Sequence, residues 1–273
     1  MDAATDKLHA ILRERRDGEV LVVTGAGVSA ESGVPTFRGK EGYWTVGARE
    51  YQPMELATLA SFRRHRREVW RWYLYRRGVC RKAAPNPGHA ALARLEEGLG
   101  DRFHLATQNV DGLHLRAGNS MERTYQIHGN IDFMRAAEGR GRALYPIPEH
   151  IQLADRDAPL TDEDYAALVT PAGEPARPHV LWFDEYYEEE LYRSDSAMTA
   201  ACRCDLLIIA GTSGAAALPH HVAAEAARAR AAILNIDPTE NPFGEFAQSR
   251  PDGLWLQGTC GRWLPPIVDA LLA

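Results

Sequence analysis

Several short polar segments of the chain have residues that could hold a phosphorylated ligand and act on it. They are a glycine-rich stretch, an amide-rich turn, two histidine-containing segments and a small hydroxyl-bearing turn. In chain order these are Gly25–Gly39, Thr107–Asp111, His128–Asn130, His179–Phe183 and Gly211–Ser213. A glycine-rich turn lets backbone N–H groups approach a pyrophosphate, and a histidine can serve as a general base near neutral pH.

The glycine-rich stretch matches neither of two common phosphate loops. A dinucleotide fingerprint needs a glycine three residues after Gly27, where the sequence has Ala30. A P-loop ends in Gly-Lys-Ser/Thr, but after the first glycine of the stretch no lysine occurs before Lys40. The stretch therefore predicts a phosphate-binding turn of another kind.

The elements around these segments predict the fold class. Short apolar runs, typical of buried strands in a parallel sheet, alternate with helical stretches. The runs cover residues 20–23, 103–106, 206–210, 233–236 and 254–256, and helices are expected at 2–17, 88–99 and 220–232. We predict an α/β protein with a Rossmann-like doubly wound parallel sheet and a small inserted domain.

Four of the predicted strands run into glycine, hydroxyl, amide or carboxylate groups. In open α/β sheets ligands bind outside the carboxyl ends of the strands. Ordinary βα turns use the same residues, but four such ends together favour one crevice for a polyhydroxylated, phosphorylated ligand. The ends are Thr24–Gly27, Thr107–Asp111, Gly211–Ser213 and Asn235–Asp237.

Residues 131–178 interrupt the pattern, with several prolines and little apolar periodicity. We predict that they form a small insert or lid, with a short helix near 162–169 that begins after Thr161. The catalytic domain is then discontinuous, formed by residues 18–130 and 179–265.

Composition excludes several classes of protein. The formal charge of −6 argues against a general nucleic-acid binder, and no stretch is apolar and long enough to span a bilayer. The four scattered cysteines do not form a disulfide framework and suit a reducing compartment. We therefore expect a soluble, cytoplasmic protein; the sequence does not indicate its oligomeric state.

The five segments, in this order, resemble the motifs of the sirtuins, the NAD-dependent protein lysine deacylases. The resemblance extends over about residues 18–265. It implies that the pocket binds NAD, which is consumed as a co-substrate, and that acyl-lysine proteins or peptides are the partners. The implied NAD-binding residues are Gly25, Ala26, Gly27, Ser29, Thr36, Phe37, Arg38, Gln108, Asn109, Asp111, Gly211, Thr212, Ser213, Asn235 and Cys260.

The resemblance also implies a mechanism, with His128 and Asn109 as the catalytic residues. The acyl oxygen of the modified lysine attacks C1′ of the ribose as nicotinamide leaves. His128 then removes a proton from a ribose hydroxyl, which attacks the acyl carbon and leads to O-acyl-ADP-ribose and free lysine. Val180 and Phe183 lie in the motif implied to contact the substrate, and the thiol of Cys260 is expected to be inert.

Three features depart from the family pattern. Sirtuins normally carry two cysteine pairs that bind a structural zinc in the segment that corresponds to 131–178, but here that segment has no cysteine. We therefore predict no zinc and expect apolar packing within the insert to replace it. Thr36 stands where many members have aspartate, and Asp184 where many have glycine, which could alter peptide docking.

The acyl preference can also be predicted. Tyr73 and Arg76 match the Tyr-x-x-Arg pattern of the sirtuin subclass that prefers succinyl- and malonyl-lysine, and Ala57 matches its widened acyl pocket. A guanidinium can pair with a distal carboxylate while a phenol donates a hydrogen bond. Alternatively, both side chains simply belong to a basic amphipathic helix over 63–82, whose aromatic residues are buried and whose arginines stay solvated.

Other functions remain open at this point. The same pocket would serve an ADP-ribosyltransferase or an NAD glycohydrolase, and the missing zinc ligands allow a non-catalytic NAD-binding module. The basic and aromatic segment 63–82 could bind single-stranded nucleic acid, but we do not expect this role. Neither do we expect a membrane partner.

Overall fold

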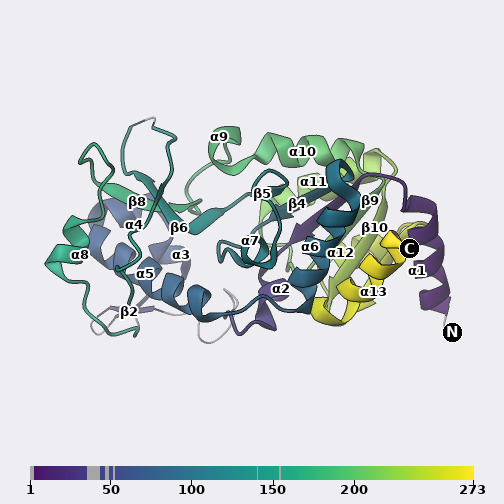
Figure 1. Cartoon of the computed structure of the whole chain (residues 1–273), viewed down its shortest axis with the longest axis horizontal. Helices are drawn as coiled ribbons and strands as arrows, with labels where there is room; N and C mark the ends of the chain where they lie inside the picture. Colours follow the sequence, from purple (N-terminus) through teal and green to yellow (C-terminus); the bar gives the residue numbers. More distant parts are fainter. Residues whose placement is uncertain (1–2, 36–43, 47–48, 52, 140, 154) are drawn as a thin grey trace.

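The computed structural model describes residues 3–35, 44–46, 49–51, 53–139, 141–153 and 155–273. Figure 1 shows an elongated molecule with a large sheet and its helices at one end, and a smaller group of elements around α5 at the other. Among the described residues, no helix has the length and apolar character needed to cross a membrane.

The large sheet has six strands in the order β11-β10-β9-β1-β4-β5, and every pairing is parallel. Chain order reverses at β1, which pairs with β9 on one side and with β4 on the other. This reversal is where an open α/β sheet forms its ligand crevice. The strands are β1 (Val20–Thr24), β4 (Phe103–Thr107), β5 (Thr124–Gln126), β9 (Leu206–Ala210), β10 (Ala232–Asp237) and β11 (Gly253–Gln257).

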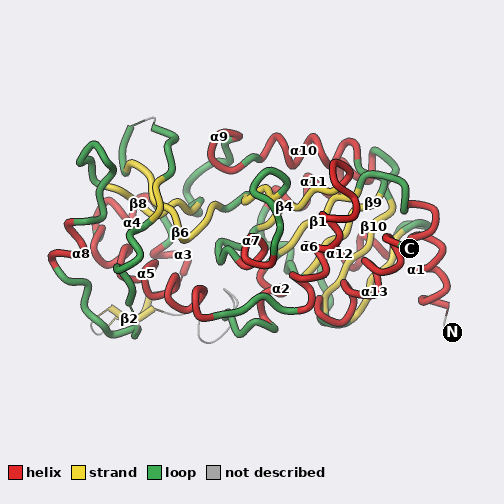
Figure 2. The backbone as a smooth tube through the Cα atoms, viewed as in Figure 1, coloured by secondary structure: helices red, strands yellow, loops and turns green. Residues whose placement is uncertain are grey.

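Helices cover both faces of this sheet, as the tube in Figure 2 also shows. Side chains alternate along each strand, so Val20 and Val22 of β1 face one apolar layer while Leu21 and Val23 face the other. The first layer is formed with α1 (Ala3–Arg15), α6 (Pro87–Leu99) and α13 (Cys260–Leu272), and the second with α10 (Ser194–Arg203), α11 (Ala217–Arg228) and α12 (Pro242–Gln248).

The other end of the molecule is built around the long helix α5 (Arg66–Lys82) and a three-stranded antiparallel sheet in the order β7-β6-β8. A separate apolar cluster joins α5 to these strands. The strands are β6 (Gly129–Ala136), β7 (Tyr145–Pro146) and β8 (Ala176–Val180), and the short helices are α3 (Pro53–Leu56), α4 (Leu59–Arg64) and α8 (Asp162–Ala166). A two-stranded ribbon, β2 (Trp44–Val46) and β3 (Arg49–Tyr51), completes this end.

The remaining short helices lie in connections: α2 (Ala26–Ala30) follows β1, α7 (Leu113–Ala117) follows β4, and α9 (Glu189–Tyr192) precedes α10. The Rossmann-like parallel sheet is confirmed, and each predicted apolar run lies within one of its strands. The predicted helix 220–232 begins earlier, at Ala217. It also ends earlier, at Arg228, because Arg230 takes a left-handed conformation with φ 65° before β10.

Two expectations about the region around α5 have different outcomes. The apolar residues expected to pack the insert do lie in or against the α5 cluster, namely Tyr145, Ile147, Ile151, Leu160, Tyr165 and Leu168. The expectation that the arginines of 63–82 stay solvated is wrong for Arg77, which is 1% exposed. Its guanidinium donates to Asp132 and to the carbonyls of Ile147 and Ile151.

Candidate active site

Three glycines allow the turns after β1 and β9 to touch backbone to backbone. Gly27 N donates to Gly211 O at 2.8 Å. A Cβ atom on Gly25 or Gly27 would lie 2.7 or 2.6 Å from the backbone of Gly211. Gly211 itself has φ 64°, a conformation that favours glycine. The two turns therefore form one continuous edge at the carboxyl ends of the strands.

The amide-rich turn after β4 is tied to this edge. Asn109 Nδ2 donates to Gly25 O at 2.9 Å and to Ser29 Oγ at 3.1 Å. Gln108 Nε2 donates to Thr212 Oγ1 at 2.9 Å. The structure thus brings together residues from three of the sequence segments that were predicted to share a site.

A buried polar network lies behind the turn. Ser29 Oγ donates to Asp111 Oδ2 at 2.7 Å, and Asp111 Oδ1 accepts from Leu113 N at 2.9 Å. His89 Nδ1 accepts from Asn86 N, so its Nε2 carries the proton and faces Ser29 Oγ at 3.5 Å. The sequence analysis did not identify His89. The one feature that could have indicated it is its position three residues after Asn86, the N-cap residue of α6.

His128, the predicted general base, follows β5 and precedes β6, and it is half-buried. Its Nδ1 lies 3.1 Å from Gln108 O. A carbonyl oxygen only accepts hydrogen bonds, so Nδ1 must carry the proton and Nε2 is the basic nitrogen of the neutral ring. Burial lowers the pKa of His128 to about 4, and at neutral pH the imidazole is therefore unprotonated and able to accept a proton.

The predicted substrate segment runs beside this histidine. Leu181 N donates to His128 O, and Phe183 N donates to Ala57 O, both at 3.0 Å. Asp184 accepts from Leu59 N at 2.7 Å and from Ala60 N at 3.1 Å, so it joins this segment to the start of α4. The side chain of Phe183 is 62% exposed, whereas Val180 is buried.

A buried ion pair fixes the segment from behind. Arg177 of β8 is 1% exposed, and its guanidinium contacts both carboxylate oxygens of Glu185, at 2.5 and 2.8 Å. The same guanidinium lies 3.5 Å from the centroid of the Trp182 ring. Glu185 also accepts from Trp182 N at 3.0 Å. Bidentate pairs of this kind have a narrow geometry, and this one sets the path of the chain after β8.

The residues predicted to read the acyl group lie close to this segment. Tyr73 is 2% exposed, and its phenol oxygen accepts from Trp182 Nε1 at 2.9 Å. Burial raises the pKa of Tyr73, while the hydrogen bond from Trp182 and the charge of Arg76 oppose that rise. The guanidinium of Arg76 lies 5.5 Å from the centroid of the Trp72 ring. Ala57 is 4% exposed. A phenol that accepts one hydrogen bond can still donate its own hydrogen.

The residues predicted to contact the adenosine half of NAD differ in their exposure. Ser213 is exposed beside Gly211, but Asn235 is fully buried and its Nδ2 donates to Ile209 O at 3.2 Å. The carboxylate of Asp237 stands at the end of β10, where the backbone of Ile236 accepts from Gly211 N. Asp237 is also buried, and its Oδ1 accepts from Thr239 N and Thr239 Oγ1, both at 2.9 Å. The assignment of Asn235 to the adenosine half stays a prediction.

Burial raises the pKa of the Cys260 thiol to about 12, which keeps it protonated and agrees with the expectation that it is inert.

Three predicted NAD-binding residues, Thr36, Phe37 and Arg38, lie outside the described residues. Among the described residues, no group of three or more His, Cys, Asp or Glu side chains could hold a metal ion. The absence of zinc stays a prediction.

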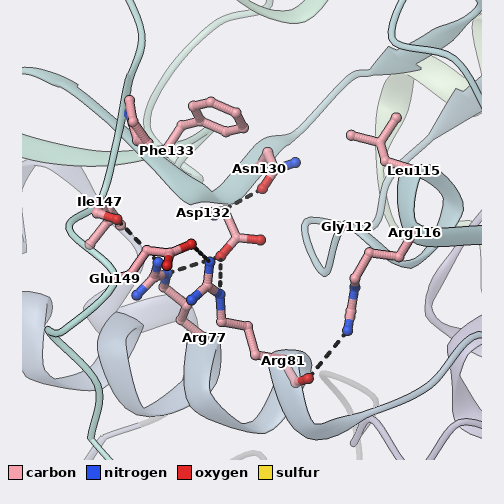
Figure 3. Close-up of a pocket in the computed structure, with 11 residues that line it drawn as sticks. Arg77, Arg81, Gly112, Leu115, Arg116, Asn130, Asp132, Phe133, Ile147 and Glu149 are labelled. Carbon is pink, nitrogen blue, oxygen red and sulfur yellow. Dashed lines mark hydrogen bonds and ion pairs between the residues drawn. The ribbon is translucent and has the colours of Figure 1, made fainter.

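A separate pocket of about 240 Å³ lies between α5, the start of α7 and β6. Figure 3 shows Arg77 and Arg81 converging on Asp132, each Nε 2.9 Å from the same carboxylate oxygen. His128 and Asn109 do not line this pocket. Arg77 and Arg81 pair with Asp132, and Arg116 donates to the backbone carbonyls of Cys80 and Ala83, so these side chains join α5 to β6 and α7.

Comparison with known proteins agrees with this arrangement. The Sir2 family profile matches residues 25–217. The chain is 35% identical over 254 residues to an NAD-dependent protein deacylase of Leptospira interrogans, with 93% of each chain covered. It is 34% identical over 271 residues to the mitochondrial NAD-dependent protein deacylase sirtuin-5 of Danio rerio, with 92% of this chain and 82% of that one covered.

A solved structure leads to the same result. The crystal structure of a Sir2 homologue in complex with NAD superimposes with a TM-score of 0.76 at 31% identity, covering 99% of this chain and 94% of the other. The family profile alone includes the glycine turn, the amide turn, His128 and the segment after β8. The chain therefore belongs to the Sir2 family.

Proposed function

We propose that the protein is an NAD-dependent protein lysine deacylase that prefers acidic acyl groups such as succinyl and malonyl. The observation that carries the proposal is the state of His128: its Nδ1 is fixed on Gln108 O and its neutral Nε2 is the basic atom. Asn109 and the segment after β8 lie on the elements that flank it. A pocket that only held NAD would not need such a base.

In the proposed reaction NAD and an acyl-lysine protein or peptide are both substrates. We assign the diphosphate to the turn Gly25–Gly27, which leads into α2 at the carboxyl end of β1. The acyl oxygen displaces nicotinamide at C1′ of the ribose. Nε2 of His128 then takes the proton of a ribose hydroxyl, and that oxygen attacks the acyl carbon. Addition of water releases free lysine and O-acyl-ADP-ribose.

His128→Ala tests the proposal. Loss of a positioned general base typically costs about 10²- to 10⁴-fold in rate, so deacylation should fall by about that amount. Calorimetry should show that NAD still binds. His9→Ala, which changes an exposed histidine of α1, is the matched control. Deacylation at the wild-type rate by His128→Ala would contradict the assignment.

Mass spectrometry of the products separates the alternatives. O-acyl-ADP-ribose and nicotinamide support a deacylase. Free ADP-ribose supports an NAD glycohydrolase, protein-bound ADP-ribose supports a transferase, and no turnover supports a binding module.

The acyl preference rests on Arg76 and Tyr73, which share a face of α5. A buried pair between a guanidinium and a distal carboxylate loses about 2–5 kcal/mol when one partner is truncated, so Arg76→Met should lower desuccinylation roughly 30-fold or more. Deacetylation should change much less, because an acetyl group carries no distal charge. Lys82→Met, at the exposed end of the same helix, is the control. Equal losses on both substrates would mean that Arg76 supports the fold instead.

The cytoplasmic location of the protein also stays a prediction.

A further inference from the structure

Tyr187 makes a contact with the general base that the mechanism does not use. Its hydroxyl oxygen lies 3.0 Å from Nε2 of His128, and the two rings stack with centroids 6.0 Å apart. Since Nδ1 holds the ring proton, Nε2 must accept this hydrogen bond and the Tyr187 phenol must donate it. Burial raises the pKa of Tyr187 to about 12, so the phenol keeps its proton at neutral pH.

This contact involves the same atom that catalysis needs. A neutral imidazole has a single lone pair in the ring plane, on its unprotonated nitrogen. While the Tyr187 hydroxyl occupies that lone pair, Nε2 cannot accept the proton of a ribose hydroxyl. The phenol oxygen therefore stands where the substrate hydroxyl has to be for proton transfer, at ordinary hydrogen-bonding distance from the base.

The chain around Tyr187 allows it to move away. On one side, Glu185 is held by the guanidinium of Arg177. On the other side, α9 begins after Glu188, whose carbonyl accepts from Tyr192 N. Tyr187 lies between these two fixed points and outside any helix or strand. Its side chain is half-buried and packs at the border of the apolar layer formed with α10 and α11. A side-chain rotation or a small shift of this short connection would free Nε2.

We propose that Tyr187 is a latch on the general base, occupying Nε2 of His128 in the ligand-free protein and leaving when the substrates bind. The inference rests on the proposed role of His128 as the base. It makes Tyr187 a positioning residue whose hydroxyl opposes formation of the reactive complex. The latch differs from a proton relay, in which the same hydroxyl would assist the reaction.

Tyr187→Phe removes the hydroxyl and keeps the stacked ring. Displacing a hydrogen bond of ordinary strength lowers kcat/KM by roughly 2- to 10-fold, so this variant should raise kcat/KM for the acyl-peptide and NAD reaction by that factor. Tyr186→Phe is the matched control, since the adjacent tyrosine is 87% exposed, and it should leave kcat/KM unchanged. A fall in kcat/KM with Tyr187→Phe would indicate a relay, and no change would indicate a structural contact. Either result overturns the latch.

A second measurement does not depend on turnover. In the ligand-free wild type at pH 7, the ¹⁵N resonance of His128 Nε2 should show an unprotonated nitrogen that accepts a hydrogen bond. The resonance should move in Tyr187→Phe and stay in place in Tyr186→Phe. An unmoved resonance would overturn the latch even in an active enzyme. Conversely, a moved resonance in a protein without deacylase activity would contradict the proposed function and leave the contact itself established.

Discussion

The two ends of the molecule are stabilised in different ways. In the parallel sheet, apolar strands are buried on both faces by helices, and strand residues such as Val22 and Ile209 are 0% exposed. Around α5, the apolar cluster surrounds charged groups: Arg77 and Arg177 are each 1% exposed and each pairs with a carboxylate. Apolar packing depends mainly on volume, whereas a buried ion pair depends on direction and on keeping both partners.

This difference has a consequence for substitutions. The sheet should tolerate volume-conserving apolar changes at small cost, typically less than about 1.5 kcal/mol. The region around α5 should tolerate the loss of a buried arginine less well, because the buried groups that accept from its guanidinium would lose their donor. The following predictions test the contrast, beginning with the largest expected effect.

Arg77→Met should lower the free energy of unfolding by about 2–3 kcal/mol, because buried carbonyls lose their donor, whereas Asp132 keeps its pair with Arg81. The carbonyls are those of Ile147 and Ile151. Urea unfolding of the whole protein measures the effect. Arg81→Met is the matched control, because Arg81 donates to the same oxygen of Asp132 but its side chain is 32% exposed. Equal losses for the two variants would remove the contrast between buried and partly exposed arginines.

Acid should destabilise the protein between about pH 6.5 and pH 3. Burial lowers the pKa of His179 to about 3, helped by the nearby charges of Arg135 and Arg177, and lowers the pKa of His89. The unfolded chain binds more protons than the folded chain in this window, so stability is complete above pH 6.5 and falls as the pH falls. Each such histidine contributes up to about 1.4 kcal/mol per pH unit.

His179→Phe assigns part of this effect to the region around α5. The replacement keeps an aromatic ring against Tyr192, with which His179 stacks at 5.5 Å. Melting temperatures measured between pH 7 and pH 5 should fall less steeply in the variant than in the wild type. If the melting temperature falls equally steeply with pH in the variant and the wild type, burial does not lower the pKa of His179.

Asp184→Ala should have the smallest effect, about 1 kcal/mol of stability, comparable with the loss of a helix cap. The side chain accepts from the backbone of Leu59 and Ala60, and this contact holds the loop that carries Ala57 near the substrate segment. We also expect a higher KM for acyl peptides with little change in kcat. Asp184→Asn retains an acceptor oxygen and should recover part of both losses. An unchanged KM in Asp184→Ala would separate this contact from substrate binding.

The same contrast explains how much of the fold could be predicted. The strands of the parallel sheet are continuous apolar runs with turn residues at their ends, so sequence alone places them. Thr161 marked the short helix α8, and the structure confirms that its side chain accepts from Asp164 N. Strands β6 and β8 were not predicted, because Asp132, Arg135 and Arg177 give them no regular alternation.

The candidate site, too, could be predicted only in part. The glycine, amide and hydroxyl-bearing segments were predicted to meet, and they do meet at the ends of β1, β4 and β9. His128, which follows β5, contacts the amide turn through Gln108 O. The hydrogen bonds that set the state of each group were beyond prediction. The proton on Nδ1 of His128 depends on the carbonyl of Gln108, and the buried amide of Asn235 depends on Ile209 O for its acceptor. Both depend on tertiary distances that spacing along the chain does not encode.

The backbone contact between the turns at Gly27 and Gly211 also bears on motion. Any side chain on these glycines would collide with main-chain atoms of the opposite turn, and Gly27 N is bonded to Gly211 O. The turns after β1 and β9 are packed backbone against backbone, so this side of the crevice is rigid. Adjustment to substrates of different size must then come from its other wall, where Phe183 is exposed and the connection through Tyr187 has no regular structure. The nucleotide side would act as a fixed template, and the acyl-peptide side as the part that adapts.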